Sequence, residues 1–66
     1  MSSTFWTLIE DKYYRVHNGI LKVAPIGNNN SVMVHEQNRV EFIELNRLNL
    51  INEILGCDFK IDDFKS

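Results

Sequence analysis

Apolar and polar residues alternate along residues 12–26, KYYRVHNGILKVAPI, on both sides of the dipeptide Asn18-Gly19. Asn and Gly accept positive φ angles more readily than other residues. An Asn-Gly pair between two such runs therefore predicts the two-residue turn of a β-hairpin. This turn sets the register of the two strands, which then pair His17 with Ile20, Val16 with Leu21, Arg15 with Lys22 and Tyr14 with Val23.

Side chains alternate between the two faces of a strand, so the hairpin is expected to have two unlike faces. One face is apolar and consists of Tyr14, Val16, Leu21 and Val23. The other face mixes aromatic, cationic and small residues, namely Tyr13, Arg15, His17, Ile20, Lys22 and Ala24. We expect the apolar face to pack against the rest of the chain.

Further short strands are predicted on both sides of the hairpin. Residues 5–10, FWTLIE, are apolar without clean alternation, which fits either a strand covered on both faces or a short helical arm. After the hairpin, Pro25 lacks a backbone donor and either ends the second strand or places it at an edge. The run GNNN predicts a loop, and the alternation in residues 31–36, SVMVHE, predicts a third strand.

The chain between residues 39 and 55 fits two interpretations. In the first, a strand over residues 39–44 is followed by a helix over residues 46–55, capped by the Asn46 side chain. In the second, a single long helix begins at Asn38. The long helix would leave Phe42 outside its apolar stripe, so we favour a strand followed by a helix.

The pattern as a whole predicts an α+β fold, a small antiparallel meander of three or four strands with one C-terminal helix packed on one face. Residues 1–66 are expected to form one domain, with a frayed start at residues 1–4. Residues 57–66 are expected to be a loose tail or an edge strand. The predicted core consists of Tyr14, Val16, Leu21, Val23, Val32, Val34, Leu48, Ile51, Ile54 and Leu55.

Composition narrows the class of protein. The chain has 66 residues, a formal net charge of −2, 44% hydrophobic and 24% charged residues, which is typical of a folded globular protein. The single cysteine excludes an internal disulfide and is typical of a reducing compartment. The N-terminus does not resemble a signal peptide, and no apolar run approaches the roughly 20 residues that span a bilayer. We therefore expect a cytoplasmic protein that does not engage a membrane.

Catalysis and metal binding are not expected. His17, His35 and Cys57 are potential zinc ligands, but they lack the closely spaced pairs typical of zinc sites. Cys57 follows Gly56 at the predicted end of the helix, where the helix dipole raises a thiol pKa. A chain of this length also has little room for a substrate pocket. We expect a protein that is not an enzyme and has no cofactor.

Recognition of another molecule is the function that the pattern favours. The candidate interaction surface consists of Tyr13, Arg15, His17, Ile20, Lys22, Phe59 and Phe64. Tyr and Arg are frequent at protein interfaces, and Phe59 and Phe64 lie in an alternating acidic tail that fits pairing with a sheet edge. The main hypothesis is a protein-interaction module whose partner is another protein or a second copy in a homodimer. The alternative is weak binding of single-stranded nucleic acid by the 13–24 hairpin face.

A resemblance to known proteins is carried by two strings. HNGILKVAPI, followed later by the helix end INEILG, resembles the layout of short uncharacterised accessory proteins of large tailed phages. The resemblance covers the hairpin and the end of the helix. It implies a small accessory protein that acts on host or phage machinery, and it implies no site residues.

Overall fold

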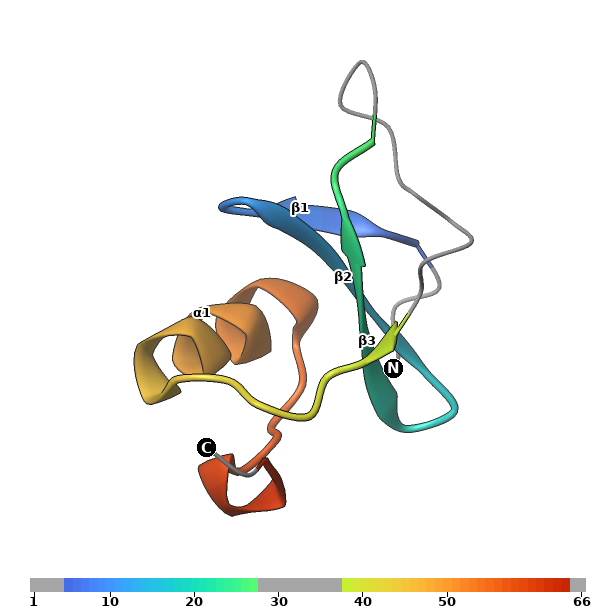
Figure 1. Ribbon diagram of the computed structural model, residues 1–66. Helices are drawn as coiled ribbons and strands as arrows, with labels where there is room; N and C mark the ends of the chain where they lie inside the picture. The colour runs from blue at the N-terminus through green and yellow to red at the C-terminus, as the bar shows by residue number, and fades with distance from the viewer. Residues whose placement is uncertain (1–4, 28–37, 65–66) are drawn as a thin grey trace.

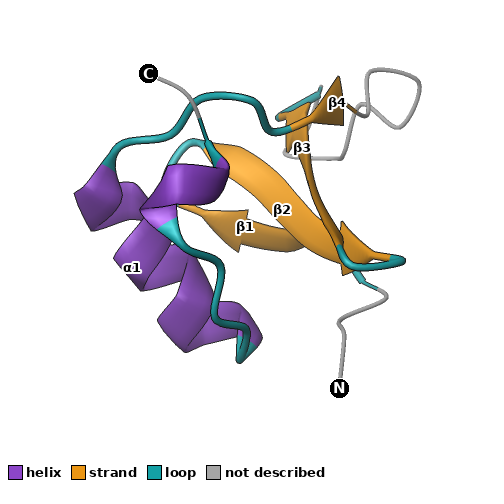
Figure 2. Ribbon diagram, turned by 90° about the horizontal axis from the view of Figure 1, so that it is seen from below, coloured by secondary structure: helices purple, strands orange, loops and turns teal. Residues whose placement is uncertain are grey.

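The computed structural model describes residues 5–27 and 38–64, which form an antiparallel sheet with a helix against one face (Figures 1 and 2). The strands lie in the sheet in chain order, β1 Thr7–Ile9, β2 Lys12–His17, β3 Ile20–Pro25 and β4 Asn38–Arg39. Helix α1, Leu45–Leu55, contacts β2, and a 3₁₀ helix, η3 Ile61–Asp63, follows it. The predicted α+β meander with one C-terminal helix is thus confirmed.

The hairpin of β2 and β3 has the register that the sequence predicts. His17 pairs with Ile20 at the turn, and the pairing continues to Lys12 and Pro25 at the other end. Asn18 and Gly19 have φ angles of 53° and 75°, as a type I′ turn requires at its two central residues. The local sequence therefore determines this hairpin.

Residues 7–9 form a strand and not a helical arm. Strand β1 pairs with β2, with Thr7 opposite Tyr14 and Ile9 opposite Lys12. This register places Ile9 on the apolar face, where it is almost fully buried. The tight turn at Glu10 and Asp11 has no glycine, and Glu10 itself adopts a φ of 61°.

The expected strand over residues 39–44 is wrong in its extent, because β4 contains only Asn38 and Arg39. Val40 still donates its backbone N–H to the carbonyl oxygen of Leu21 at 3.0 Å and is buried. The chain then leaves the sheet to reach α1, and Phe42 is 67% exposed. The strand expected at residues 31–36 lies outside the described residues.

Helix α1 begins one residue before its predicted start and ends as predicted. Glu44 is the N-cap residue and makes no side-chain capping bond, so the expected cap at Asn46 is wrong. At the other end Gly56 adopts a left-handed φ of 70° and donates its N–H to the carbonyl oxygen of Asn52. The alternative of a single helix from Asn38 is excluded by β4 and by the non-helical residues 40–44.

The core lies between the sheet and α1. Its buried side chains, Ile9, Tyr14, Val16, Leu21, Val40, Leu48 and Ile51, come from three strands, the segment after β4 and the helix. Val23 and Leu55 are half-buried beside them. The prediction that Ile54 belongs to the core is wrong. Ile54 is 47% exposed, because it lies at the margin of the helical stripe formed by Leu48, Ile51 and Leu55. Val32 and Val34 lie outside the described residues.

Arg47 joins the first turns of α1 to the turn between β1 and β2. Its guanidinium lies 2.8 Å from a carboxylate oxygen of Glu10 and 3.1 Å from one of Asp11. It also donates a hydrogen bond of 3.1 Å to the hydroxyl oxygen of Tyr14. These contacts hold the glycine-free turn against the helix.

The ion pairs of Arg47 predict an acid-sensitive contribution to stability. Desolvation favours the neutral carboxyl of Asp11, but Lys12, a backbone hydrogen bond and Arg47 outweigh it and lower the pKa of Asp11. A carboxyl whose pKa is lowered in the folded state stabilises the fold above about pH 4. This stabilisation is lost as the pH falls through the folded-state pKa. We expect Arg47→Met to lower the free energy of unfolding at pH 7 and to weaken its fall below pH 4, measured by urea denaturation. Equal acid sensitivity in both proteins would contradict this role.

Candidate interaction surface

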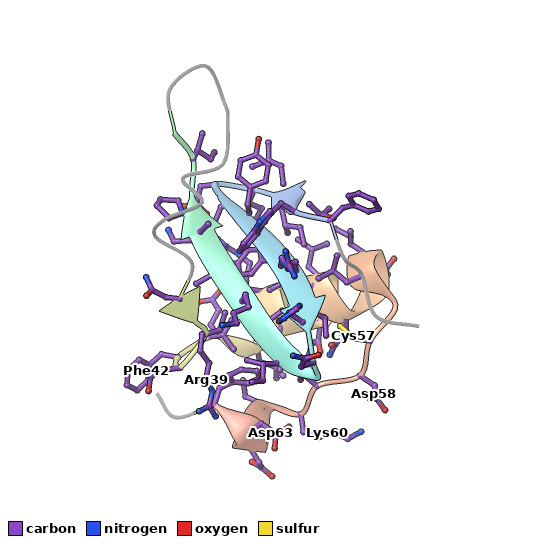
Figure 3. All side chains as sticks on the ribbon, turned by 90° about the vertical axis from the view of Figure 1, so that its right-hand side faces the viewer. Arg39, Phe42, Cys57, Asp58, Lys60 and Asp63 are labelled. Atoms are coloured by element: carbon purple, nitrogen blue, oxygen red, sulfur yellow. The ribbon has the colours of Figure 1, made fainter. Side chains whose placement is uncertain are left out.

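The predicted hairpin residues of the interaction surface all lie on the face of the sheet opposite α1, here called the outer face. Figure 3 looks onto this face, with α1 behind the strands. His17 and Ile20 are exposed, whereas Tyr13, Arg15 and Lys22 are half-buried. Ala24 shares this face but is fully buried. Among the hairpin residues of the outer face, those next to the Asn18-Gly19 turn are therefore the most accessible.

Three cations lie in a row across the outer face, here called the cation row. Lys22 on β3 is paired with Arg15 on β2 and with Arg39 on β4. Directly paired side chains have Cβ atoms roughly 4.5–5.5 Å apart, and like charges at such positions destabilise a sheet. Within residues 5–27 and 38–64, the ion pairs are made by Lys12 and Arg47 and not by the cation row. The row therefore presents concentrated positive charge on a protein whose net charge is −2.

Arg15 is held flat on the outer face by its neighbours. Its guanidinium carbon lies 5.6 Å from the ring centroid of Trp6, a cation–π contact. Its Nη2 donates a 2.7 Å hydrogen bond to Nδ1 of His17, so this nitrogen is the unprotonated one. Nε of Arg15 is buried and has no hydrogen-bond partner in the described part of the chain. The aromatic ring and the imidazole thus fix the position of the charge.

The two tail aromatics pack against the core, and the hollow that they line reaches Arg39 of β4 and Ile20 of the outer face. The rings of Phe59 and Phe64 pack edge to face, with centroids 6.0 Å apart, and both rings contact the hydrophobic core. They line a hollow of about 230 Å³, here called the tail hollow. Its lining residues are Ile20, Leu21, Arg39, Val40, Phe59, Asp63 and Phe64. The fold therefore brings the two separate parts of the predicted surface together at Ile20.

The described tail is neither loose nor an edge strand. Residues 57–60 have no regular secondary structure, and η3 follows them. Asn52 on α1 fixes this path, because its amide group donates to the carbonyl oxygen of Phe59 and accepts from the Phe59 N–H, both at 2.9 Å. This bidentate contact could not be predicted from the sequence, because it joins α1 to the irregular segment that follows it.

The surroundings of Cys57 indicate a role in packing and not in catalysis. Its thiol is half-buried and donates a 3.3 Å hydrogen bond to the same Asn52 side-chain oxygen. Burial raises the pKa of this thiol, so the reactive thiolate is disfavoured. Among residues 5–27 and 38–64, no three His, Cys, Asp or Glu side chains gather as metal ligands. His35 lies outside these ranges.

Arg39 is the functional candidate that sequence reasoning missed. It is exposed, it completes the cation row and it lines the tail hollow. Figure 3 shows it at the edge of the sheet, on the same side as Asp63 of η3. The signal was weak because the pairing of β4 with β3 joins segments that are distant in the sequence.

The comparisons with protein-family models, with curated proteins and with solved structures found no match. None of the described helices has the length and apolar character needed to cross a membrane.

Proposed function

We propose that this chain is a non-catalytic protein-interaction module of an accessory or regulatory kind, and that the outer face of its sheet binds the partner. The observation that carries the proposal is the cation row. Three like charges on neighbouring strands are unfavourable in the free protein. A partner that supplies carboxylates converts this repulsion into attraction and gains affinity from it.

The residues around the cation row support a protein partner. Trp6, Tyr13 and Arg15 represent the three residue types that dominate binding energy at protein interfaces. Leu8 and Ile20 add exposed apolar surface on the same face, being 46% and 40% exposed. Because Trp6 already contacts Arg15 with its ring, it is less suited to stacking on a nucleic-acid base.

A different protein fits the outer face better than a second copy of this chain. In a twofold dimer the same patch meets itself. An outer face paired with its own copy would bring two cation rows together, and like charges at an interface cost affinity. We therefore propose a heterologous partner with an acidic contact surface.

The proposal is tested by affinity capture from a bacterial lysate, the source that the phage resemblance indicates. We expect the tagged protein to retain a stoichiometric protein band after nuclease treatment and to lose it in Lys22→Glu/Arg39→Glu. The matched control is Lys12→Glu/Lys60→Glu, which changes net charge equally, lies off the cation row and should retain the band.

Two outcomes would contradict the proposal. A band that the Lys22→Glu/Arg39→Glu variant retains would show that the cation row is not the contact surface. Recovery that disappears with nuclease, and that weakens steeply with salt, would indicate nucleic acid as the partner.

A further inference from the structure

We propose that the outer face recognises an extended acidic segment of its partner, and that one large apolar side chain of this segment enters the tail hollow. This inference rests on the proposed function and deepens it, because it names the chemistry of the bound segment. The cation row supplies the charge specificity and the tail hollow supplies the apolar specificity.

The cation row and the tail hollow adjoin each other on the surface. Arg39 is the last cation of the row and also lines the tail hollow. Ile20 is 40% exposed on the outer face and lines the same hollow. A segment that crosses the strands along the row therefore reaches the border of the hollow at Arg39.

The dimensions of the row indicate an extended segment. Neighbouring strands lie about 4.8 Å apart, so the row from Arg15 to Arg39 spans about 10 Å. In an extended chain, side chains on one face repeat about every 6.6 Å. Two carboxylates at alternate positions therefore cover the row, and the next alternate position lies at the hollow.

The lining of the hollow indicates an apolar side chain. Leu21, Val40, Phe59 and Phe64 provide its apolar surface. Its volume of about 230 Å³ lies below the roughly 300–1,000 Å³ of clefts that hold drug-sized ligands. Asp63 at the lining disfavours a third carboxylate at this position. One aromatic or branched aliphatic side chain fits this combination.

The hollow is preformed, which lowers the entropic cost of binding. Asn52 holds the backbone of Phe59 through two hydrogen bonds. The backbone N–H of Phe64 donates to the carbonyl oxygen of Ile61 at 3.0 Å, which closes η3 beneath the second ring. The two rings therefore keep their positions in the free protein.

The test uses a capped peptide of sequence Phe-Ser-Glu-Ser-Glu-Ser-Phe, which presents an aromatic residue at either end and so fits in both chain directions. Binding is followed by ¹⁵N–¹H correlation spectra of the full chain. We expect shifts at Lys22, Arg39, Phe59 and Phe64. We also expect about tenfold weaker binding when both phenylalanines of the peptide are replaced by alanine, because no large apolar side chain is then available to fill the hollow.

A protein variant tests the hollow without endangering the core. Ile20→Ala removes exposed apolar lining and is expected to reduce the difference between the two peptides. Leu8→Ala is the matched control, because Leu8 is exposed to a similar degree on β1, away from the hollow, and should preserve the difference.

The remaining outcomes separate this inference from the proposed function. Equal binding of both peptides, with shifts confined to the cation row, would overturn the role of the hollow and leave the proposed function intact. Failure of both peptides together with outer-face shifts by an oligothymidylate would overturn both. Failure of every probe at millimolar concentration would overturn the inference.

Discussion

Val16→Asp is expected to unfold the protein. Val16 lies on β2 and is only 6% exposed, between the sheet and α1. A carboxylate there would lie among the apolar side chains of the core, and burial of an unpaired charge costs several kcal/mol. A chain of this length is expected to have a total stability of roughly 3–10 kcal/mol. Far-ultraviolet circular dichroism and the dispersion of amide resonances should both show the loss of the fold.

The control for this experiment is the next residue on the same strand. His17 is exposed on the outer face, so His17→Asp should fold like the parent protein. The contrast between these neighbouring positions tests the assignment of the two faces and not merely whether β2 tolerates an aspartate. A folded Val16→Asp protein would show that the core does not lie on this side of the sheet.

Asn52→Ala is expected to release the tail from α1 and to lower the free energy of unfolding by about 2 kcal/mol. The substitution removes both partners of the Phe59 backbone, and unsatisfied partly buried groups of this kind cost about 1–3 kcal/mol. Urea denaturation measures the loss. Hydrogen exchange should also become faster at the Phe59 amide.

Asn49→Ala provides the comparison, because Asn49 lies on the same helix with its side chain exposed. Both substitutions improve helix propensity by a similar amount. The difference between them therefore isolates the tail contact. If Asn52→Ala is no less stable than Asn49→Ala, the two hydrogen bonds do not hold the tail.

The parts of the fold that could be predicted are those encoded by neighbouring residues. The Asn18-Gly19 turn determines both strands of the hairpin, their register and the residues on each face. Gly56 likewise marks the end of α1. In both cases a residue suited to positive φ stands where the backbone needs it, and the signal is local.

The parts that could not be predicted depend on contacts between distant segments. The turn after β1 has a glutamate, Glu10, at positive φ, where a turn signal would require Gly or Asn. Arg47 from the distant helix α1 contacts this turn instead. Val40 is buried because it continues the pairing of β4 with β3. The candidate surface shows the same division. Its hairpin residues were found from their alternation, whereas Arg39 and the meeting of Ile20 with the tail aromatics arise from tertiary structure.

The alternation along β2 has a consequence for how such a protein can change over generations. Residues that hold the fold alternate along β2 with residues proposed to contact the partner. Substitutions can therefore alter partner choice while the interior stays constant. An insertion or deletion of one residue within β2 would instead exchange the two sets along part of the strand. Divergence on this strand is thus expected to proceed by replacement at constant length.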